Sequence, residues 1–333
     1  MRSSSTERGY SVPLGVIAKL SWTNKRNRKI FRRSTERFVW RNSQVRRPNA
    51  GAIEVSQSQG RRVSLRRLNH GLTAMKIATW NVNSLKVRLP HVLDWLKTQQ
   101  VDILCLQETK LIDERFPVQA LADAGYGALF SGQPTYNGVA ILWRVDRHWE
   151  PSAVQVGNPH FPDEQKRLIS ATFNGTRVIS AYVPNGQEVG SDKYDYKLRW
   201  LDALGGWVSE TLSQTGNLVI AGDYNIAPDD RDVHDPQAWA GQVLCSDPER
   251  QRFRALLGLG LHDAFRLFEQ PEKVYSWWDY RQLAFRRNKG LRIDHLLVSE
   301  ALRPRVSRCM VDRAPRKLEQ PSDHAPVLIE LTD

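Results

Sequence analysis

Side chains able to bind a cation or move a proton follow a short apolar segment near the middle of the chain. The run 218–221 is followed by Gly222, Asp223, Tyr224 and Asn225. Residues two apart on a strand share a face, so a buried strand here would aim Asp223 and Asn225 at one spot from a rigid support. Taken by itself, the segment is better explained as a strand that ends in an Asx turn.

The same pattern recurs along the chain, and this recurrence favours a shared polar site over isolated turns. Five further segments of strand-like composition carry an amide, carboxylate, phenol or imidazole at or near one end: Asn81 after 77–80, Glu108 after 103–107, Tyr182 after 178–181, Asp294 within 292–298, and Asp323 with His324 before 325–329. We expect these strand ends to converge on one site.

The combined set is dominated by hard oxygen donors. Carboxylates and amides without a thiolate suit Mg²⁺, with Mn²⁺ as a substitute, better than Zn²⁺. Several carboxylates held close together repel one another and would take up protons unless a cation were bound among them. Because Mg²⁺ shares its coordination with water and phosphate oxygens, the set predicts metal-assisted hydrolysis of a phosphodiester or a phosphomonoester.

Some of these residues also have an explanation without catalysis. Asn81 could cap a turn, Tyr182 could be a half-buried core residue, and Asp294 could pair with Arg292. His295 follows Asp294 directly, so on a strand it faces the opposite side and is expected to be structural.

The basic charge of the chain is confined to its N-terminal segment. Residues 1–74 hold 17 Lys and Arg against 3 Asp and Glu, a net charge of +14, whereas 75–333 hold 31 against 33, a net charge of −2. The segment is rich in Arg and Ser without sustained periodicity, so it is predicted to be disordered. It could be a nucleic-acid-binding tail, an organellar targeting peptide, or the product of an upstream start codon. We favour the last, because Met75 directly begins the first predicted strand.

The three cysteines, Cys105, Cys245 and Cys309, are odd in number and far apart in the sequence. This pattern argues against a disulfide framework and against a zinc site, and it favours a reducing compartment. No run of about 18 apolar residues is present, so no membrane-spanning segment is expected. We therefore predict a cytoplasmic protein without a membrane partner, and organellar targeting by residues 1–74 is left open.

Residues 75–333 alternate between strand-like and helix-like segments and are predicted to form a single domain. Strands are expected at 76–81, 102–107, 139–143, 167–173, 177–183, 218–222, 292–298 and 324–331. Helical spacing of apolar residues predicts helices over 86–99 and around 198–212, and a third helix is expected to begin with Asp247 as its capping acid. The segment 226–247 is expected to be a long loop. A hairpin signal at Asn174-Gly175, together with these helices, predicts an α/β sandwich of two β-layers flanked by helices.

The polar strand ends lie within motifs that closely resemble the exonuclease III family of the endonuclease/exonuclease/phosphatase superfamily. The resemblance covers 75–333, excludes the first 74 residues, and implies a four-layered α/β sandwich that hydrolyses phosphodiesters. The motifs occur in the family's order: Thr79-Trp-Asn81-Val-Asn83-Ser, Leu106-Gln-Glu108-Thr-Lys110, Asn137-Gly138-Val-Ala, Tyr182-Val-Pro-Asn185-Gly, Gly222-Asp223-Tyr-Asn225, Ser276-Trp277-Trp278-Asp279-Tyr-Arg281, Leu291-Arg-Ile-Asp294-His and Ser322-Asp323-His324-Ala-Pro.

The resemblance also implies a role for each polar residue. Glu108 is similar to the family's principal metal ligand, in a set of direct or water-mediated ligands that also holds Asn81, Asp223, Asn225, Asp323 and His324. Asp223 would orient or activate the attacking water, Asn225 would hold a phosphate oxygen, and Tyr182 would stabilise the transition state. Asp294 would fix the ring of His324, which would bind the scissile phosphate or transfer a proton.

The stretch 275–281 indicates the substrate, because aromatic residues stand there beside an arginine. Aromatic faces stack on bases, and arginine contacts phosphate. In the resembled family an aromatic loop here meets the DNA minor groove at an abasic site, which implies that role for Trp277 or Trp278, while the other is expected in the core. Further candidate DNA contacts are Arg281, Asn185 and Lys110, with Lys193, Lys197, Arg286 and Arg287 as additional candidates for phosphate.

The sequence therefore predicts a monomeric, Mg²⁺-dependent DNA repair nuclease. It would be a 3′-to-5′ exodeoxyribonuclease and an abasic-site endonuclease that cuts double-stranded DNA 5′ to the lesion and leaves a 3′-hydroxyl. One alternative is a phosphatase of the same superfamily that acts on a small or lipid phosphoester, and the aromatic stretch argues against it. The other is a binding module without catalysis, which the complete set of acids, amides and histidine argues against.

Overall fold

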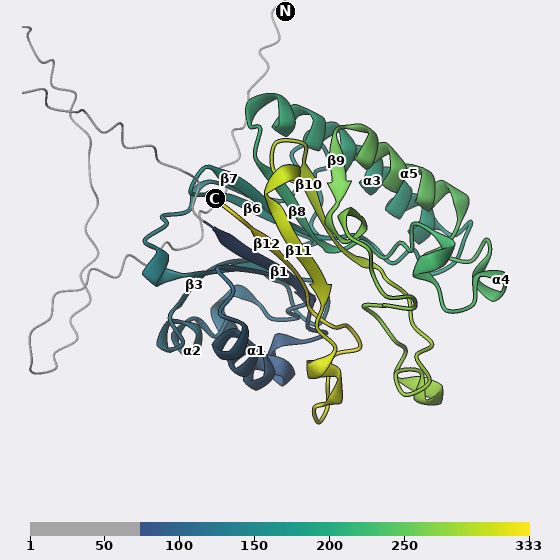
Figure 1. The fold of residues 1–333 in the computed structure, drawn as a ribbon, viewed down its shortest axis with the longest axis horizontal. Helices are drawn as coiled ribbons and strands as arrows, with labels where there is room; N and C mark the ends of the chain where they lie inside the picture. The colour runs from purple at the N-terminus through teal and green to yellow at the C-terminus, as the bar shows by residue number, and fades with distance from the viewer. Residues whose placement is uncertain (1–73) are drawn as a thin grey trace, which may run out of the picture. The chain divides into compact units, whose positions relative to one another are not determined.

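The computed structural model describes residues 74–333, so the predictions for the N-terminal basic segment lie outside the described residues, apart from Ala74. Two six-stranded mixed sheets pack face to face, and helices cover the outer face of each sheet (Figure 1). This arrangement is the predicted four-layered α/β sandwich. Within residues 74–333, no helix is long and apolar enough to cross a membrane.

The first sheet has the strand order β11-β12-β1-β2-β4-β3. Its central strands β1 and β2 run parallel, and the other neighbouring pairs are antiparallel. Helices α1 (Leu85–Gln99) and α2 (Val118–Asp123) cover its outer face. Its strands are β1 (Met75–Asn81), β2 (Ile103–Gln107), β3 (Tyr126–Ser131), β4 (Val139–Arg144), β11 (Val306–Val311) and β12 (Val327–Leu331).

The second sheet has the order β5-β6-β7-β8-β10-β9, again with one central parallel pair, β7 and β8. Helices α3 (Asp192–Gln214) and α5 (Asp247–Gly258) cover its outer face. The short helix α4 (Pro236–Trp239) lies in the connection from β8 to α5. The strands are β5 (Ser152–Val156), β6 (Leu168–Phe173), β7 (Thr176–Tyr182), β8 (Leu218–Asp223), β9 (Leu261–Asp263) and β10 (Asp294–Ser299).

Alternation along the central strands separates the apolar core into layers. In β1, Ile77 packs between the two sheets, whereas Trp80 packs on the side of α1. In β8, Val219 packs between the sheets, and Ile220 packs on the side of α3 and α5. Because side chains of a strand point to alternate faces, strands buried on both faces read as continuous apolar runs.

A chain of buried polar side chains also joins the two sheets near the ends of β2 and β7. Thr79 Oγ1 donates to Gln107 Oε1 at 3.1 Å, and Gln107 Nε2 donates to Ser180 Oγ at 3.2 Å. All three residues are completely buried. Satisfied buried hydrogen bonds of this kind specify one relative placement of the sheets.

Two local predictions concerned turn and cap residues. The Asn174-Gly175 turn joins β6 to β7 as predicted, because both residues have left-handed φ, 44° and 75°. The choice of Asp247 as the cap of α5 was wrong. Ser246 is the residue that caps the helix. Its backbone N–H has no acceptor within the helix and instead donates to Glu249 Oε2 at 3.0 Å.

Several strand boundaries also differ from the prediction. The last strand begins at Val327 rather than at 324, because Pro326 has no N–H to donate to a neighbouring strand. Strand β10 begins at Asp294 rather than at 292. The expected loop 226–247 contains α4 and a 3₁₀ turn, Asp230–Asp232. Strands β3, β5, β9 and β11 were not predicted.

Candidate active site

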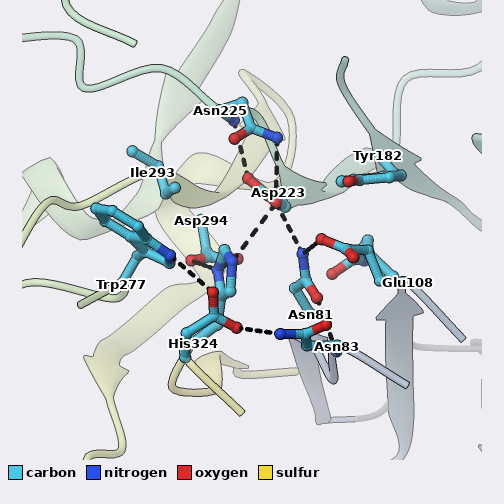
Figure 2. A network of polar contacts seen from close by, with 12 residues as sticks. Asn81, Asn83, Glu108, Tyr182, Asp223, Asn225, Trp277, Ile293, Asp294 and His324 are labelled. Atoms are coloured by element: carbon cyan, nitrogen blue, oxygen red, sulfur yellow. Dashed lines mark hydrogen bonds and ion pairs between the residues drawn. The ribbon is translucent and has the colours of Figure 1, made fainter. Parts of the chain in front are cut away.

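The ends of the two parallel pairs place the candidate residues at one edge of the sandwich. Asn81 is the last residue of β1, and Glu108 directly follows β2. Tyr182 and Asp223 are the last residues of β7 and β8 and lie opposite each other. Asp294 begins β10 and pairs in register with Asp223. The predicted convergence of strand ends is therefore present (Figure 2).

Asn81 connects the carboxylates of Glu108 and Asp223. Its Nδ2 donates to Glu108 Oε1 at 2.8 Å and to Asp223 Oδ2 at 2.9 Å. Its Oδ1 accepts the backbone N–H of Asn83 at 3.0 Å, so Asn81 also caps a turn, as the alternative explanation proposed. Because the amide is fully buried, it holds acidic groups from two different sheets at a short, fixed separation.

His324 forms a buried pair with Asp294 and also faces Asp223. Its Nδ1 lies 2.8 and 3.1 Å from the two oxygens of Asp294, and its Nε2 lies 3.8 Å from Asp223 Oδ2. Burial alone would lower the pKa of His324, but the carboxylates of Asp294 and Asp223 outweigh it and raise the pKa to about 10. Burial also raises the pKa of Asp223. Asp294 does not pair with Arg292, whose guanidinium binds other carboxylates.

The backbone around Glu108 is strained. Glu108 and Lys110 both have left-handed φ values, 51° and 53°, which few residues other than glycine adopt. Lys110 Nζ lies 2.8 Å from Glu108 Oε2, so this candidate DNA contact is engaged with the carboxylate.

Tyr182 lies between a cation and a carboxylate. The Arg167 guanidinium lies 4.6 Å from the ring centre of Tyr182. Burial and then the Glu108 carboxylate raise the pKa of Tyr182 well above its usual range, so the phenol keeps its proton.

Asn225 lies beyond the end of β8, in a tight turn. Its φ is 49°, and its backbone N–H donates to Asp223 Oδ1 at 2.9 Å, which makes an Asx turn. Its Nδ2 donates to Val183 O at 3.0 Å and to Asp223 Oδ2 at 3.3 Å. Its Oδ1 accepts from Asn185 Nδ2 at 3.2 Å. Both explanations of this segment, an Asx turn and a polar site, therefore hold.

Asp323 reaches the site from the loop before β12. Its Oδ1 accepts from Asn83 Nδ2 and its Oδ2 from Trp277 Nε1, both at 3.0 Å. Of the two tryptophans, Trp278 is completely buried and therefore cannot contact DNA in this conformation, whereas Trp277 is partly exposed at the site. Arg281 is exposed and forms an ion pair with the carboxylate two residues before it.

The prediction that Lys197 contacts phosphate is wrong. Its side chain is fully buried, and its Nζ pairs with Glu249. The physical reason is its position on α3, where Tyr194, Lys197, Leu201 and further residues form the buried stripe of an amphipathic helix. Spacing of three and four residues from these apolar neighbours could have identified it as buried.

Two residues that shape this region were not predicted. Asn83 binds Asp323 and repeats the two-residue spacing seen elsewhere, which was a usable signal. Arg88 of α1 donates to Asn83 O at 2.6 Å, Pro321 O at 3.0 Å and the Tyr280 hydroxyl at 3.2 Å. The contacts with Pro321 and Tyr280 tie α1 to the stretch 275–281 and to the loop before β12, and they join residues too far apart in the sequence for a local signal.

Glu108, Asp223 and His324 form a group that could bind a cation. Each offers one ligand atom, and these atoms all lie within 4.8 Å of one another. Two carboxylates carried by opposite sheets suit a hard divalent cation. The carboxylates of Asp294 and Asp223 raise the pKa of His324 and so favour its imidazolium form, in which Nε2 donates to an anionic oxygen rather than binding a metal ion. The donor set therefore fits Mg²⁺ bound by oxygens beside a protonated imidazole.

Comparison with known proteins decides the family. Residues 78–324 match the Endonuclease/Exonuclease/phosphatase family. The chain belongs to this family. The resemblance seen in the motifs is confirmed, and so is the enzyme class, a phosphodiester hydrolase of the exonuclease III type.

Three relatives show how far the likeness extends. Exodeoxyribonuclease III of Haemophilus influenzae is 34% identical over 270 residues, which are 77% of this chain and 99% of that protein. The 3′ phosphatase NExo from Neisseria, in a structure bound to a product DNA hairpin, is 47% identical with a TM-score of 0.75, over 78% of this chain and 100% of that one. An AP endonuclease from Archaeoglobus fulgidus is 38% identical with a TM-score of 0.73, over 78% and 99%.

Proposed function

We propose that this protein is a Mg²⁺-dependent DNA repair nuclease that removes nucleotides or blocking groups from 3′ ends and cuts duplex DNA 5′ to abasic sites. The observation that carries the proposal is the approach of Glu108, Asp223 and His324 to within 4.8 Å of one another. Relatives named as an exodeoxyribonuclease, a 3′ phosphatase and an AP endonuclease support DNA as the substrate. In all these reactions water attacks phosphorus and a 3′-oxygen leaves, so one site can perform them.

The carboxylates and amides would hold the ion. Glu108 is the principal ligand in this proposal, and Asn81, Asp223, Asn225 and Asp323 support it directly or through water. When bound, Mg²⁺ polarises the scissile phosphate and offsets its negative charge.

The remaining groups act on water and phosphate. Asp223, whose pKa burial raises, orients the attacking water and accepts its proton as the oxygen bonds to phosphorus. His324, kept protonated by Asp294, donates from Nε2 to a phosphate oxygen. Tyr182 keeps its proton and, with the Asn225 amide, donates hydrogen bonds to the charge that develops on the phosphate oxygens. As its bond to phosphorus breaks, the 3′-oxygen takes a proton from a water molecule and becomes the 3′-hydroxyl.

Recognition of the lesion would fall to the aromatic segment. Trp277 is the tryptophan that is partly exposed at the site, and its indole is already tied to Asp323. An exposed aromatic face can stack on a base or fill the gap left by a missing one. We also propose that the enzyme acts as a monomer, because the two sheets of one chain already bring together the carboxylates and the histidine that the reaction needs.

Three end-labelled duplexes test the proposal. One carries a single internal abasic analogue, one ends in a 3′-phosphate, and one is undamaged with a recessed 3′ end. With Mg²⁺ we expect a single cut 5′ to the lesion, release of the 3′-phosphate, and stepwise shortening. If all three stay intact while a soluble inositol phosphate is hydrolysed, the protein is instead a phosphatase for small or lipid phosphoesters.

A further inference from the structure

A buried ammonium group adjoins the candidate active site. Lys197 projects from α3 with a completely buried side chain. Its Nζ donates to Asn185 O at 3.0 Å, to Asn225 O at 2.7 Å and to the Glu249 carboxylate of α5. These three acceptors satisfy all three protons of the ammonium. Burying a charged pair has a large desolvation cost, so such a pair adds little to stability and its presence calls for another explanation.

The neighbouring backbone is packed tightly around this pair. Gly186 has a φ of 93°, and a Cβ at this position would lie 3.1 Å from Lys197 Cδ, so both conformation and space favour glycine. On the other side, Glu249 accepts the backbone N–H groups of Leu244 and Ser246, each at 3.0 Å. One ion pair therefore fixes the loop after β7, the turn after β8 and the start of α5.

The two carbonyls held by Lys197 belong to residues whose side chains meet at the site. Asn185 Nδ2 donates to Asn225 Oδ1, and Asn225 donates to both oxygens of Asp223 through its side chain and its backbone. A displacement of the ammonium would move both asparagines and change the hydrogen bonds that orient Asp223. Lys197 itself is enclosed and cannot touch the substrate.

We propose that Lys197 is a positioning residue of the hydrolytic site, which acts through Asn185 and Asn225 and is itself held by Glu249. The inference rests on the proposed function, in which Asp223 and Asn225 act on water and phosphate. A buried pair that served stability alone could be replaced by uncharged side chains without an effect on the chemical step. A positioning residue instead affects turnover after the substrate is bound.

The test compares steady-state cleavage of the 3′-end and abasic duplexes by two variants. Lys197→Met removes the ammonium and leaves Glu249 buried without its partner. Lys197→Met/Glu249→Gln removes both charges, so it is expected to fold even if the single variant does not. We expect kcat to fall roughly 10- to 100-fold with KM changed less than about threefold. A folded double variant with the kcat of the wild type would overturn the proposal.

Tyr194→Phe is the matched control. It removes a buried hydrogen bond between the tyrosine hydroxyl of α3 and Ser246 at the start of α5, and it leaves in place the hydrogen bond from Ser246 Oγ to Glu249 and the three hydrogen bonds of the Lys197 ammonium. We expect its kcat to equal that of the wild type, and an equal loss in this variant would mean that general loosening of α3 and α5 explains the effect. In addition, a double variant with Asn225→Ala and Lys197→Met should have the same kcat as Asn225→Ala alone. If the two substitutions reduce kcat additively, Lys197 does not act through Asn225.

A second measurement does not depend on activity. The side-chain amide signals of Asn185 and Asn225 in a ¹H–¹⁵N NMR spectrum should shift in the double variant and stay in place in Tyr194→Phe. If the wild type hydrolyses none of the duplexes, the proposed function fails, and these amide signals still decide the positioning role. Unchanged signals in the double variant would refute it.

Discussion

Replacing Asp294 by asparagine tests whether two carboxylates keep His324 protonated. The two carboxylate oxygens of Asp294 lie 2.8 and 3.1 Å from His324 Nδ1, and Asp223 Oδ2 lies 3.8 Å from His324 Nε2. Burial alone would lower the pKa of His324, yet these carboxylates raise it from 6.5 to about 10. That rise corresponds to roughly 5 kcal/mol in favour of the imidazolium.

Asparagine keeps the shape of the side chain and one acceptor oxygen but removes the charge. Asp294 makes the closer contact and raises the pKa of His324 more than Asp223 does, so we expect the pKa of His324 to fall clearly below its wild-type value. Because a raised pKa stabilises the folded state fully below pH 6.5 and less as the pH approaches 10, Asp294→Asn should destabilise the metal-free protein more at pH 6 than at pH 10. We also expect kcat to fall by roughly 10² to 10⁴, as for other acid–histidine pairs.

The assay is a pH titration of the imidazole signals by NMR in EDTA, with the wild type and Asp294→Asn side by side. It is performed without metal because a bound cation would change the charge near Asp223. An unchanged pKa of His324 in a folded Asp294→Asn protein would refute the electrostatic reasoning. A lowered pKa with an unchanged kcat would instead show that the charge on His324 has no part in catalysis.

Three further predictions follow from other contacts. Trp277→Phe removes the hydrogen bond to Asp323, so Mn²⁺ affinity measured by calorimetry should fall about tenfold, and equal affinity would exclude Asp323 as a ligand oriented by Trp277. Burial lowers the pKa of His295 to about 4 in the folded protein. As the pH falls from 6.5 to 4, His295 is therefore protonated in the unfolded protein but not in the folded one, and the folded protein loses about 3 kcal/mol of stability. Urea unfolding should show this loss in the wild type and not in His295→Gln, which retains a donor and an acceptor. A chain that begins at Met75 should keep its cleavage rate at moderate salt, and a large loss would make residues 1–74 a DNA-binding arm.

The parts of the fold that follow from local pattern could be predicted from the sequence. Strand β8 is a continuous apolar run because both of its faces are buried, and Asp223 at its end is where such a run must stop. The hairpin at Asn174-Gly175 follows from two residues that accept left-handed φ. Strands β5 and β11 were missed because exposed side chains interrupt both of them, so their sequences lack a clear apolar pattern.

The site could be predicted as a set of residues but not as a set of contacts. Asp223 and His324 were identified from their motifs, whereas the Asn81 amide between two carboxylates depends on how two sheets pack. Lys197 reaches Glu249 across 52 residues of sequence. This partner is determined by tertiary packing, so the apolar spacing along α3 can indicate that Lys197 is buried but not which carboxylate it pairs with.

The most direct test of the central claim is cleavage of the abasic duplex by the wild type and by Glu108→Gln, each with Mg²⁺ and with EDTA. Glu114→Gln, a change at an exposed acid nearby, is the control. We predict one cut 5′ to the lesion that needs Mg²⁺, full activity in the control, and a loss of at least about 100-fold in Glu108→Gln, or about 3 kcal/mol of transition-state stabilisation. Cleavage that persists in EDTA, or that is unaffected by Glu108→Gln, would contradict the assignment of Glu108, Asp223 and His324 to a metal-dependent phosphodiesterase site.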